Sequence, residues 1–248
     1  MATGFEWMEA ERVTPYYQHG GVTIYHGDSR EIVPSLDFVG LVLTDPPYGI
    51  SHPTDYATRR GAVGPLGMRT DYPAVMGDGE WFDPRWLIDV GAARIIWGGN
   101  YFSSALPDVS GWLVWDKERP DNLDQATCEL AWTDCVKGVR RFRWLWNGAI
   151  RRGDEKLQHP TQKPAALMRW CMSLRWTEKY ATILDPYMGS GSTLRAAKDL
   201  GKSAIGIEMS ERYCEVAARR LDQESLHLPP APSEMTQAPL LSAIKPTV

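Results

Sequence analysis

Short runs of apolar residues recur along the chain, and helical patterns separate several of them. Seven runs rich in β-branched and aromatic residues have the length and composition of buried strands, at residues 22–25, 39–44, 93–97, 112–115, 129–132, 181–184 and 203–207. Apolar residues at helical spacing predict helices at 164–176, 192–200 and 210–221. The first begins with Pro164, and the last has Ser210 as its expected cap. Because strands alternate with helices, we expect an α/β domain with a largely parallel sheet.

Three segments depart from this alternation. The runs at 112–115 and 129–132 have no obvious helix between them, so we expect an antiparallel pair at one edge of the sheet. Residues 51–81 are rich in Gly, Pro and charged residues without sustained periodicity, which is typical of a lid or binding loop. Residues 228–248 hold five prolines and are expected to form a disordered tail. The pattern therefore predicts a single domain over residues 1–227.

Composition and charge narrow the class of protein. A chain of 248 residues with 43% hydrophobic residues can bury a sizeable core. The formal net charge of −4 argues against a uniformly basic surface but allows a local basic groove. Four cysteines without paired short spacing, and without His at metal-site distances, predict no metal site and reduced thiols, as in a cytoplasm. Without a membrane-length apolar run or a secretory layout in residues 1–12, we expect a soluble cytoplasmic protein that does not contact membranes.

A glycine-rich turn follows the strand expected at 181–184. It reads Asp-Pro-Tyr-Met-Gly-Ser-Gly-Ser-Thr from Asp185 to Thr193. Gly189 and Gly191 suit a tight turn that lets a ligand approach the backbone, and the lysine of a phosphate-binding P-loop is missing. About 20 residues further on, the next strand ends at Glu208, whose carboxylate suits the hydroxyls of a ribose. This pairing favours a site for a nucleoside-containing cofactor over a structural turn.

A second motif, Asp-Pro-Pro-Tyr from Asp45 to Tyr48, follows the strand at 39–44. Asp45 can accept a hydrogen bond from an amine, and the stiff Pro46-Pro47 backbone can fix the Pro46 carbonyl as a second acceptor. Tyr48 offers an aromatic face on which a flipped base can stack. The alternative is an ordinary turn that follows a strand.

Together the two motifs resemble those of the amino-group DNA methyltransferases. The catalytic motif precedes the cofactor motif, which resembles the permuted β class of that family, as does the His-Pro-Thr-Gln-Lys-Pro sequence that begins at His159. The Tyr-His-Gly-Asp sequence ends at Asp28, an acid that the family places near the adenine of its cofactor. The resemblance extends from about residue 22 to residue 221. It implies a Rossmann-like fold with a seven-stranded, mostly parallel sheet, and S-adenosylmethionine as the cofactor.

The resemblance also implies site residues and a reaction. The catalytic residues would be Asp45, Pro46, Pro47 and Tyr48. The cofactor-binding residues would be Asp28, His159, Lys163, Asp185, Pro186, Gly189, Gly191, Ser192, Thr193 and Glu208. The expected product is N6-methyladenine in duplex DNA, since the related cytosine-N4 enzymes more often begin this motif with Ser than with Asp.

Other functions stay open at this point. Cytosine-N4 methylation uses the same geometry, and a catalytically silent DNA-binding subunit would keep the fold. A protein-glutamine methyltransferase would begin the motif with Asn, and a nicotinamide dehydrogenase has no place for Asp-Pro-Pro-Tyr. The enzyme would belong to a restriction–modification system or act as an orphan or phage methylase.

DNA contacts are expected in a short basic segment at residues 133–158, where family members carry a longer target-recognition region. Its basic residues alternate with Trp144 and Trp146, which suits phosphate contacts and stacking, although a solvated charged hairpin is the alternative. The expected DNA-binding residues are Lys137, Arg140, Arg141, Arg143, Arg151 and Arg152. Because one such segment is short, we expect a homodimer that presents two. Residues 97–102 line the base pocket or simply form the turn that ends a strand.

Overall fold

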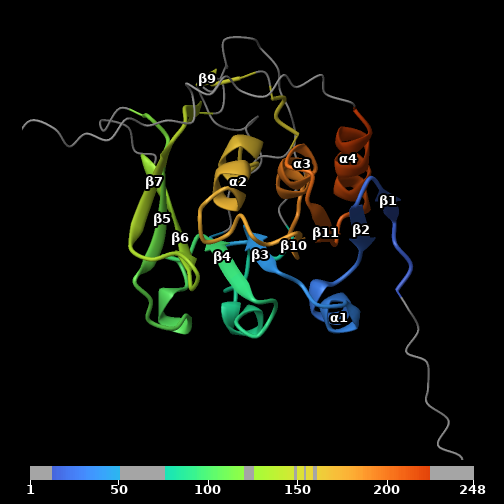
Figure 1. The fold of residues 1–248 in the computed structure, drawn as a ribbon, viewed down its shortest axis with the longest axis horizontal. Coiled ribbons are helices and arrows are strands. Elements are labelled where there is room, and N and C mark those ends of the chain that lie inside the picture. The colour runs from blue at the N-terminus through green and yellow to red at the C-terminus, as the bar shows by residue number, and fades with distance from the viewer. Residues whose placement is uncertain are drawn as a thin grey trace, which may run out of the picture.

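A nine-stranded sheet crosses the molecule in the computed structural model, which describes residues 13–50, 76–119, 126–147, 150–153, 155–158 and 161–223. The strand order is β1-β2-β11-β10-β3-β4-β6-β5-β7 (Figure 1). The strands are β1 (Tyr17–His19), β2 (Val22–His26), β3 (Leu41–Thr44), β4 (Ala93–Trp97), β5 (Gly111–Asp116), β6 (Cys128–Thr133), β7 (Val139–Arg143), β10 (Thr182–Asp185) and β11 (Ser203–Glu208). A separate hairpin consists of β8 (Trp146–Asn147) and β9 (Ile150–Arg151).

Helices cover both faces of this sheet. They are α1 (Ser29–Ile32), α2 (Ala165–Met172), α3 (Ser192–Asp199) and α4 (Glu211–Asp222), with 3-10 turns η1 (Val33–Ser35), η2 (Pro84–Leu87) and η3 (Ser103–Ala105). Figure 1 shows α2, α3 and α4 side by side on one face and α1 on the other. The sheet is therefore the middle layer of three.

The apolar residues Leu41, Val42 and Leu43 of β3 show why the central strands carry hydrophobic side chains on both faces. Leu41 and Leu43 belong to the core that includes Leu167 of α2 and Leu194 of α3. Val42 points the other way, into the core that includes Ile32 of α1. Successive side chains of a strand alternate between faces, so a strand covered on both faces must be apolar throughout. Each such side chain stabilises the fold by roughly 1.5–3 kcal/mol.

Strand direction brings the two motifs to one edge of the sheet. β2, β11, β10, β3 and β4 are parallel, so their carboxyl ends meet at the same edge. β5 and β7 run in this direction as well, whereas β6 is antiparallel to β4 and β5. Asp45, Asp185 and Glu208 all lie at these carboxyl ends, where ligands bind in open α/β sheets.

The seven predicted strands are all present, and the α/β prediction is confirmed. The sheet contains two more strands, so the expected count of seven is too low. The predicted antiparallel pair is β5 with β6, in which Trp112 faces Trp132. It is not at the edge, because β7 pairs with β5 from outside. The Val-Arg-Arg-Phe-Arg sequence of β7 has no apolar run that would predict a strand. β7 is a strand because it pairs with β5, not because of its composition.

The three predicted helices are also present, with two differences at their ends. α2 ends at Met172, four residues before the predicted end. Ser210 precedes α4 as expected, but its side chain forms no capping hydrogen bond, so that detail of the prediction was wrong. Instead its backbone N–H donates to Glu208 Oε1 at 2.8 Å. No helix in the described part of the chain is both long and apolar enough to cross a bilayer.

Candidate active site

Asp45 lies directly after β3 and has a hydrogen-bond donor on each carboxylate oxygen. The hydroxyl of Tyr48 donates to Oδ1 at 2.6 Å, and Lys163 Nζ donates to Oδ2 at 2.6 Å. Lys163 also donates to the hydroxyl of Tyr48 at 3.0 Å. From the sequence, Lys163 was expected to bind the cofactor, but its ammonium group contacts the proposed catalytic residues.

Further charged groups continue this arrangement away from Asp45. Lys163 Nζ lies 2.9 Å from Glu129 Oε2, and Lys117 Nζ lies 2.5 Å from Glu129 Oε1. Burial alone would raise the pKa of Glu129, but the two lysines outweigh it and lower the pKa to about 2. Burial would likewise lower the pKa of Lys163, yet Asp45 and Glu129 raise it. Both groups are therefore charged, and Lys163 is fixed between two carboxylates.

Burial raises the pKa of Asp45, whereas the neighbouring Lys163 lowers it and only partly offsets the burial. The side chain of Asp45 is 18% exposed, against 5% for Lys163. The Asp45 carboxylate is thus the more accessible end of this ion pair, and it is a strong hydrogen-bond acceptor because little water competes for it.

The ring of Tyr48 is held from two sides. It stacks on Tyr101, with ring centroids 4.7 Å apart and an angle of 19° between the planes. On another side it packs on Gly98, where a Cβ would lie 2.0 Å from Tyr48 Cε1. Gly98 has a φ of +75°, so both its backbone conformation and its missing side chain are required. The 97–102 turn therefore contacts Tyr48 directly.

Asp78 fixes the backbone that follows the catalytic motif. Its Oδ1 accepts hydrogen bonds from the N–H groups of Tyr48, Gly49 and Ile50, at 3.1, 3.0 and 3.3 Å. The side chain is buried. Asp78 belongs to the predicted 51–81 loop, of which residues 51–75 lie outside the described residues.

Asp185 is buried at the carboxyl end of β10, beside the glycine-rich turn. Its Oδ1 accepts hydrogen bonds from Thr44 Oγ1 at 2.8 Å and from the N–H of Tyr187 at 3.2 Å. Burial raises the pKa of this carboxyl to about 7, despite those hydrogen bonds. Asp185 can therefore change its charge near neutral pH.

Glu208 holds the turn from the neighbouring strand. The N–H of Gly189 donates to Glu208 Oε2 at 3.1 Å. Gly191 has a φ of +80°, and a Cβ there would lie 2.9 Å from the Cβ of Ala217 in α4. The second glycine of the motif thus allows α4 to pack closely, a role that sequence analysis did not identify.

A pocket joins the catalytic acid to the glycine-rich turn. It is lined by Asp45, Thr161, Gln162, Lys163, Met168, Asp185, Tyr187, Met188, Gly189, Ser190, Ser192 and Thr193. Its enclosed part measures about 50 Å³, which suits one polar end of a ligand rather than a whole nucleoside. Ser192 Oγ is buried here without a hydrogen-bond partner in the described residues. A second hollow of about 560 Å³, between Trp81 and Pro107, shares none of these side chains.

Several predicted cofactor residues lie outside this lining. Pro186 is buried behind the turn, and Glu208 and Gly191 support it as described above. The Asp28 side chain accepts a hydrogen bond from Arg30 N–H at 2.8 Å and caps α1. His159 lies outside the described residues.

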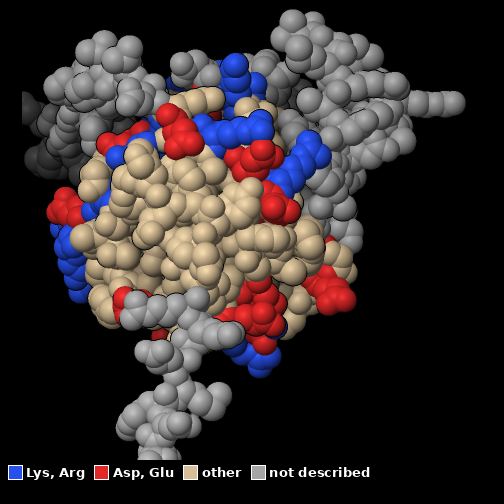
Figure 2. Space-filling model, turned by 90° about the vertical axis from the view of Figure 1, so that its right-hand side faces the viewer, with Lys and Arg blue, Asp and Glu red and all other residues tan. Residues whose placement is uncertain are grey.

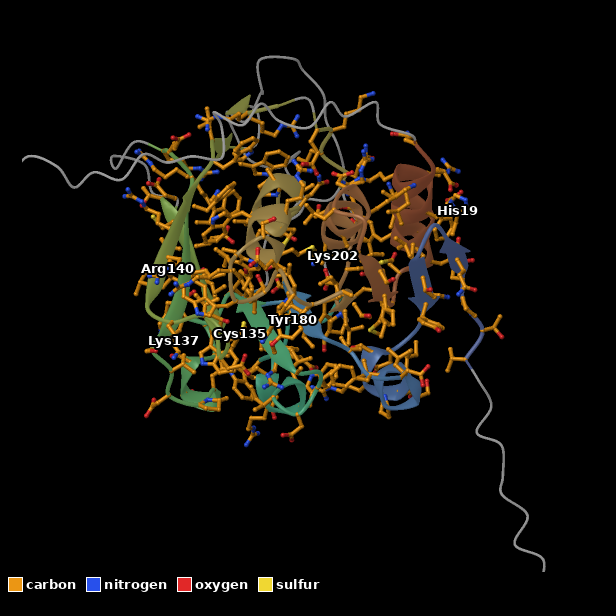
Figure 3. All side chains as sticks on the ribbon, viewed as in Figure 1. His19, Cys135, Lys137, Arg140, Tyr180 and Lys202 are labelled. Carbon is orange, nitrogen blue, oxygen red and sulfur yellow. The ribbon has the colours of Figure 1, made fainter. Side chains whose placement is uncertain are left out.

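Five of the six predicted DNA-binding residues fall into two groups, and the sixth, Arg141, lies in the middle of β7. Arg143 ends β7 at the catalytic edge and Arg151 and Arg152 lie in or next to β9, whereas Lys137 and Arg140 lie near the start of β7. Figure 3 shows Lys137 and Arg140 at one end of the sheet, with Lys137 close to Cys135. A strand rises about 3.3 Å per residue, so Arg140 and Arg143 are separated by roughly 10 Å along β7.

Contacts of these basic residues differ as well. Arg143 lies 3.2 Å from Asp116, and Arg152 lies 3.0 Å from Glu118. The guanidinium of Arg140 lies over the ring of Trp176 at 4.9 Å, and that of Arg151 over Trp146 at 5.4 Å. Arg141 is exposed on β7.

Sequence analysis did not identify Glu129 or Asp78. Glu129 did carry a signal, because it is an acid within the apolar run of β6 and such a charge needs a buried partner. Asp78 gave no such signal in the sequence. Its three hydrogen bonds form only because the loop between β3 and η2 brings it back to the backbone after Asp45.

Comparison with known proteins places the chain in a family. The DNA methylase model N6_N4_Mtase matches residues 113–219. The type II methyltransferase M2.DpnII of Streptococcus pneumoniae is 38% identical over 262 aligned positions, which cover 85% of this chain and 93% of the relative. The type II methyltransferase M.HpaI of Haemophilus parainfluenzae is 38% identical over 225 positions, which cover 75% of this chain and 69% of the relative.

A solved structure shows the same fold. The cytosine-N4-specific PvuII DNA methyltransferase aligns with a TM-score of 0.57 at 14% identity, over 86% of this chain and 90% of its own. The fold, the two motifs at one sheet edge and the relatives agree. The chain belongs to the DNA methylases of the N6/N4 amino-group family, which take their methyl group from S-adenosylmethionine.

Proposed function

We propose that this methyltransferase transfers a methyl group from S-adenosylmethionine to N6 of an adenine that is flipped out of duplex DNA. The observation that carries the proposal is that Asp45 and the glycine-rich turn line one pocket. An acceptor for an amine thus lies beside a site that suits the methyl donor. The aspartate at position 45 supports adenine over cytosine, through the resemblance noted above.

The pocket residues fit the amino-acid end of the cofactor. The Asp185 carboxylate suits an ammonium group, and the free hydroxyl of Ser192 at the start of α3 suits a carboxylate, which the helix N-terminus also favours. Glu208 and Asp28 would hold the ribose and the adenine along the open edge. When bound, the cofactor supplies an electrophilic methyl group on a sulfonium.

Asp45 would act on the target amine. The exocyclic nitrogen is a poor nucleophile because its lone pair is delocalised into the ring. Hydrogen bonds from its two protons to Asp45 and to the Pro46 carbonyl favour a tetrahedral nitrogen whose lone pair faces the methyl group. The amine would displace the Tyr48 hydroxyl from Asp45 Oδ1, and positioning supplies much of the rate.

Lys163 and Glu129 support this role. Lys163 holds Asp45 Oδ2 at 2.6 Å, which leaves Oδ1 as the oxygen that faces the substrate. Glu129 balances the charge of Lys163, so that the lysine orients Asp45 without fully neutralising it. As the new N–C bond forms and the S–C bond breaks, the nitrogen becomes cationic and loses one proton through Asp45 to solvent.

Tyr48 and the basic residues at the catalytic edge would hold the DNA. The flipped base would stack on the face of the Tyr48 ring that is turned away from Tyr101, which would offset part of the few kcal/mol that unstacking costs. Arg143, Arg151 and Arg152 lie at this edge and would contact phosphates. In this proposal Lys137, which precedes β7, and Arg140, whose guanidinium packs on Trp176, do not contact phosphates.

Nucleoside analysis tests the proposal. The protein is incubated with duplex DNA of mixed sequence and methyl-labelled S-adenosylmethionine, and the DNA is digested and separated by mass spectrometry. We expect labelled N6-methyladenine, and N4-methylcytosine would contradict the adenine assignment. Asp45→Ala should abolish the product while the affinity for S-adenosylhomocysteine stays within about twofold. DNA binding without any methylated product from the parent protein would indicate a silent subunit.

A further inference from the structure

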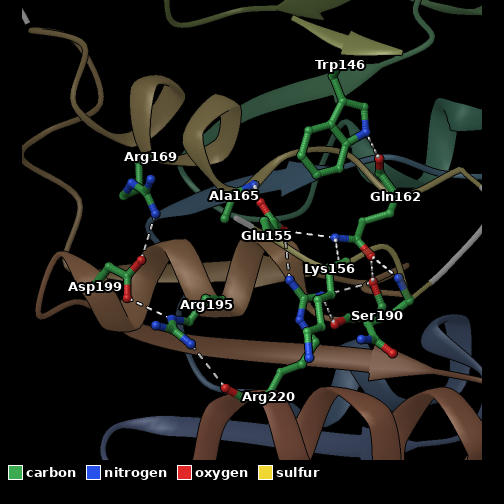
Figure 4. Close-up of polar contacts among 11 residues, drawn as sticks. Trp146, Glu155, Lys156, Gln162, Ala165, Arg169, Ser190, Arg195, Asp199 and Arg220 are labelled. Carbon is green, nitrogen blue, oxygen red and sulfur yellow. Dashed lines mark hydrogen bonds and ion pairs between the residues drawn. The ribbon is translucent and has the colours of Figure 1, made fainter. Parts of the chain in front are cut away.

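A largely buried polar cluster holds the glycine-rich turn, and two of its members, Gln162 and Ser190, also line the pocket. It consists of Glu155, Gln162, Ser190 and Arg220, which come from four separate segments of the chain (Figure 4). Gln162 and Ser190 are almost fully buried, with 6% and 3% of their surface exposed. The reaction proposed above uses neither Glu155 nor Arg220.

Glu155 is the centre of this cluster. Its Oε1 accepts hydrogen bonds from Arg220 Nη2 at 2.9 Å and from Gln162 Nε2 at 2.8 Å. Its Oε2 accepts one from the N–H of Ala165 at 3.0 Å, in the first turn of α2. A single carboxylate therefore joins α2, α4 and the segment before α2.

Arg220 extends these contacts to the turn itself. Its Nη1 donates to the backbone carbonyl of Ser190 and, at 3.0 Å, to Ser190 Oγ. Ser190 Oγ in turn donates to Gln162 Oε1 at 3.3 Å. Ser190 lies between the two glycines of the motif, so Arg220 holds the part of the turn with the least steric restriction.

We propose that Glu155 and Arg220 are positioning residues for the cofactor, which fix Ser190 and thereby set the shape of the turn before the cofactor binds. This inference rests on the proposed function, because it assigns the turn to S-adenosylmethionine. Gly189 and Gly191 allow backbone conformations that other residues rarely adopt. Contacts from outside the turn are therefore needed to fix one of these conformations.

The cluster also connects the turn to the basic residues at the catalytic edge. Glu155 follows Arg151 and Arg152 closely in sequence, and the N–H of Arg152 donates to the carbonyl of Leu145 at 2.9 Å. Trp146 Nε1, from β8, donates to the carbonyl of Gln162 at 3.1 Å. The β8–β9 hairpin and the turn thus share one hydrogen-bonded network.

The test compares three substitutions by calorimetric titration with S-adenosylhomocysteine and by methylation kinetics. Glu155→Gln and Arg220→Met should each raise the Kd at least tenfold, whereas kcat at saturating cofactor should change less than threefold. Arg220→Lys keeps a cation in the cluster and should recover part of the affinity. Asp134→Asn is the matched control, because Asp134 lies just after β6, at the sheet edge opposite the turn, and the substitution breaks its ion pair with Arg94.

Each outcome decides between the inference and its alternatives. If Asp134→Asn lowers Tm as much as Glu155→Gln but leaves the Kd unchanged, loss of stability does not explain the weaker binding. Equal affinity in the parent, Glu155→Gln and Arg220→Met would overturn the inference, as would an equal loss in Asp134→Asn. If the parent protein itself fails to bind S-adenosylhomocysteine, the proposed function fails first, and this inference with it.

Discussion

Gly98 determines where the Tyr48 ring can lie, because any side chain at position 98 would occupy the same space as that ring. Gly98→Ala would place a methyl group where the Tyr48 ring now lies, 2.0 Å from Cε1. We expect Tyr48 to move and methylation to fall by about 100-fold, the cost of a 1 Å misplacement of reacting groups. Gly20→Ala is the control, since Gly20 has a φ of +58° but open space around its Cβ position. Similar losses of activity in both variants would show that backbone strain, not contact with Tyr48, is responsible.

The raised pKa of Asp185 leads us to expect that the affinity for the cofactor depends on pH. Its pKa of about 7 means that the group is neutral below pH 7 and negatively charged above it. The charged form attracts an ammonium group, so the affinity for S-adenosylhomocysteine should rise as pH increases from 5.5 to 7.5. The change should reach at most about tenfold per pH unit below the pKa. In Asp185→Asn, titrations across the same range should show weaker binding and no such dependence, and an unchanged dependence would assign it to another group.

At the scale of single residues, the sequence predicted the chemistry of Asp45 and Tyr48 because short motifs carry both. It did not predict that Lys163 contacts Asp45, since 118 positions separate them and only folding brings them together. Asp78 and Gly98 were missed as supports of Tyr48 for the same reason. Local patterns identify the groups that react, whereas the groups that hold them come from distant segments.

At the scale of elements, β7 offers a test of DNA binding. Arg143 lies at the catalytic edge and Arg140 nearer the opposite one, so they form a matched pair on one strand. Arg143→Ala should weaken DNA binding and reduce the slope of log K against log salt by about 0.9, the value for one phosphate contact. Arg140→Ala should leave the slope unchanged, because its guanidinium packs on Trp176. Fluorescence anisotropy at several salt concentrations measures both, and equal slopes in the two variants would contradict this division.

The elements themselves were predictable to differing degrees. β3, β4 and β10 were clear from the sequence because both faces of the central sheet are covered, which demands continuous apolar runs. β7 was not, because only one of its faces packs on the molecule, through Arg140 and Phe142, while Val139, Arg141 and Arg143 on the other face are exposed. The end of α2 was also misplaced, since its apolar pattern continues through Trp176 beyond the hydrogen-bonded helix.

At the scale of the whole molecule, one side has a broad area without charged side chains. Figure 2 shows the side that carries β1 and α4, with a broad area free of Lys, Arg, Asp and Glu and charged side chains around it. Tyr16 and Met209 are exposed, and both contact His26. We expect a homodimer, and light scattering coupled to size-exclusion chromatography should give about twice the chain mass of 27.9 kDa. A monomer at micromolar concentration would show that one protomer contacts DNA alone.

The position of β7 at the end of the sheet has a consequence for solubility. In the described part of the chain, its outer backbone groups face no further strand, and such an edge invites pairing with another unfolded or folded chain. Arg141 and Arg143 place two positive charges along this edge, and charges of one sign repel a second copy of it. The same arginines would therefore reduce aggregation through this edge. A substitution that probes a DNA contact on β7 should accordingly leave the other arginine of the pair in place.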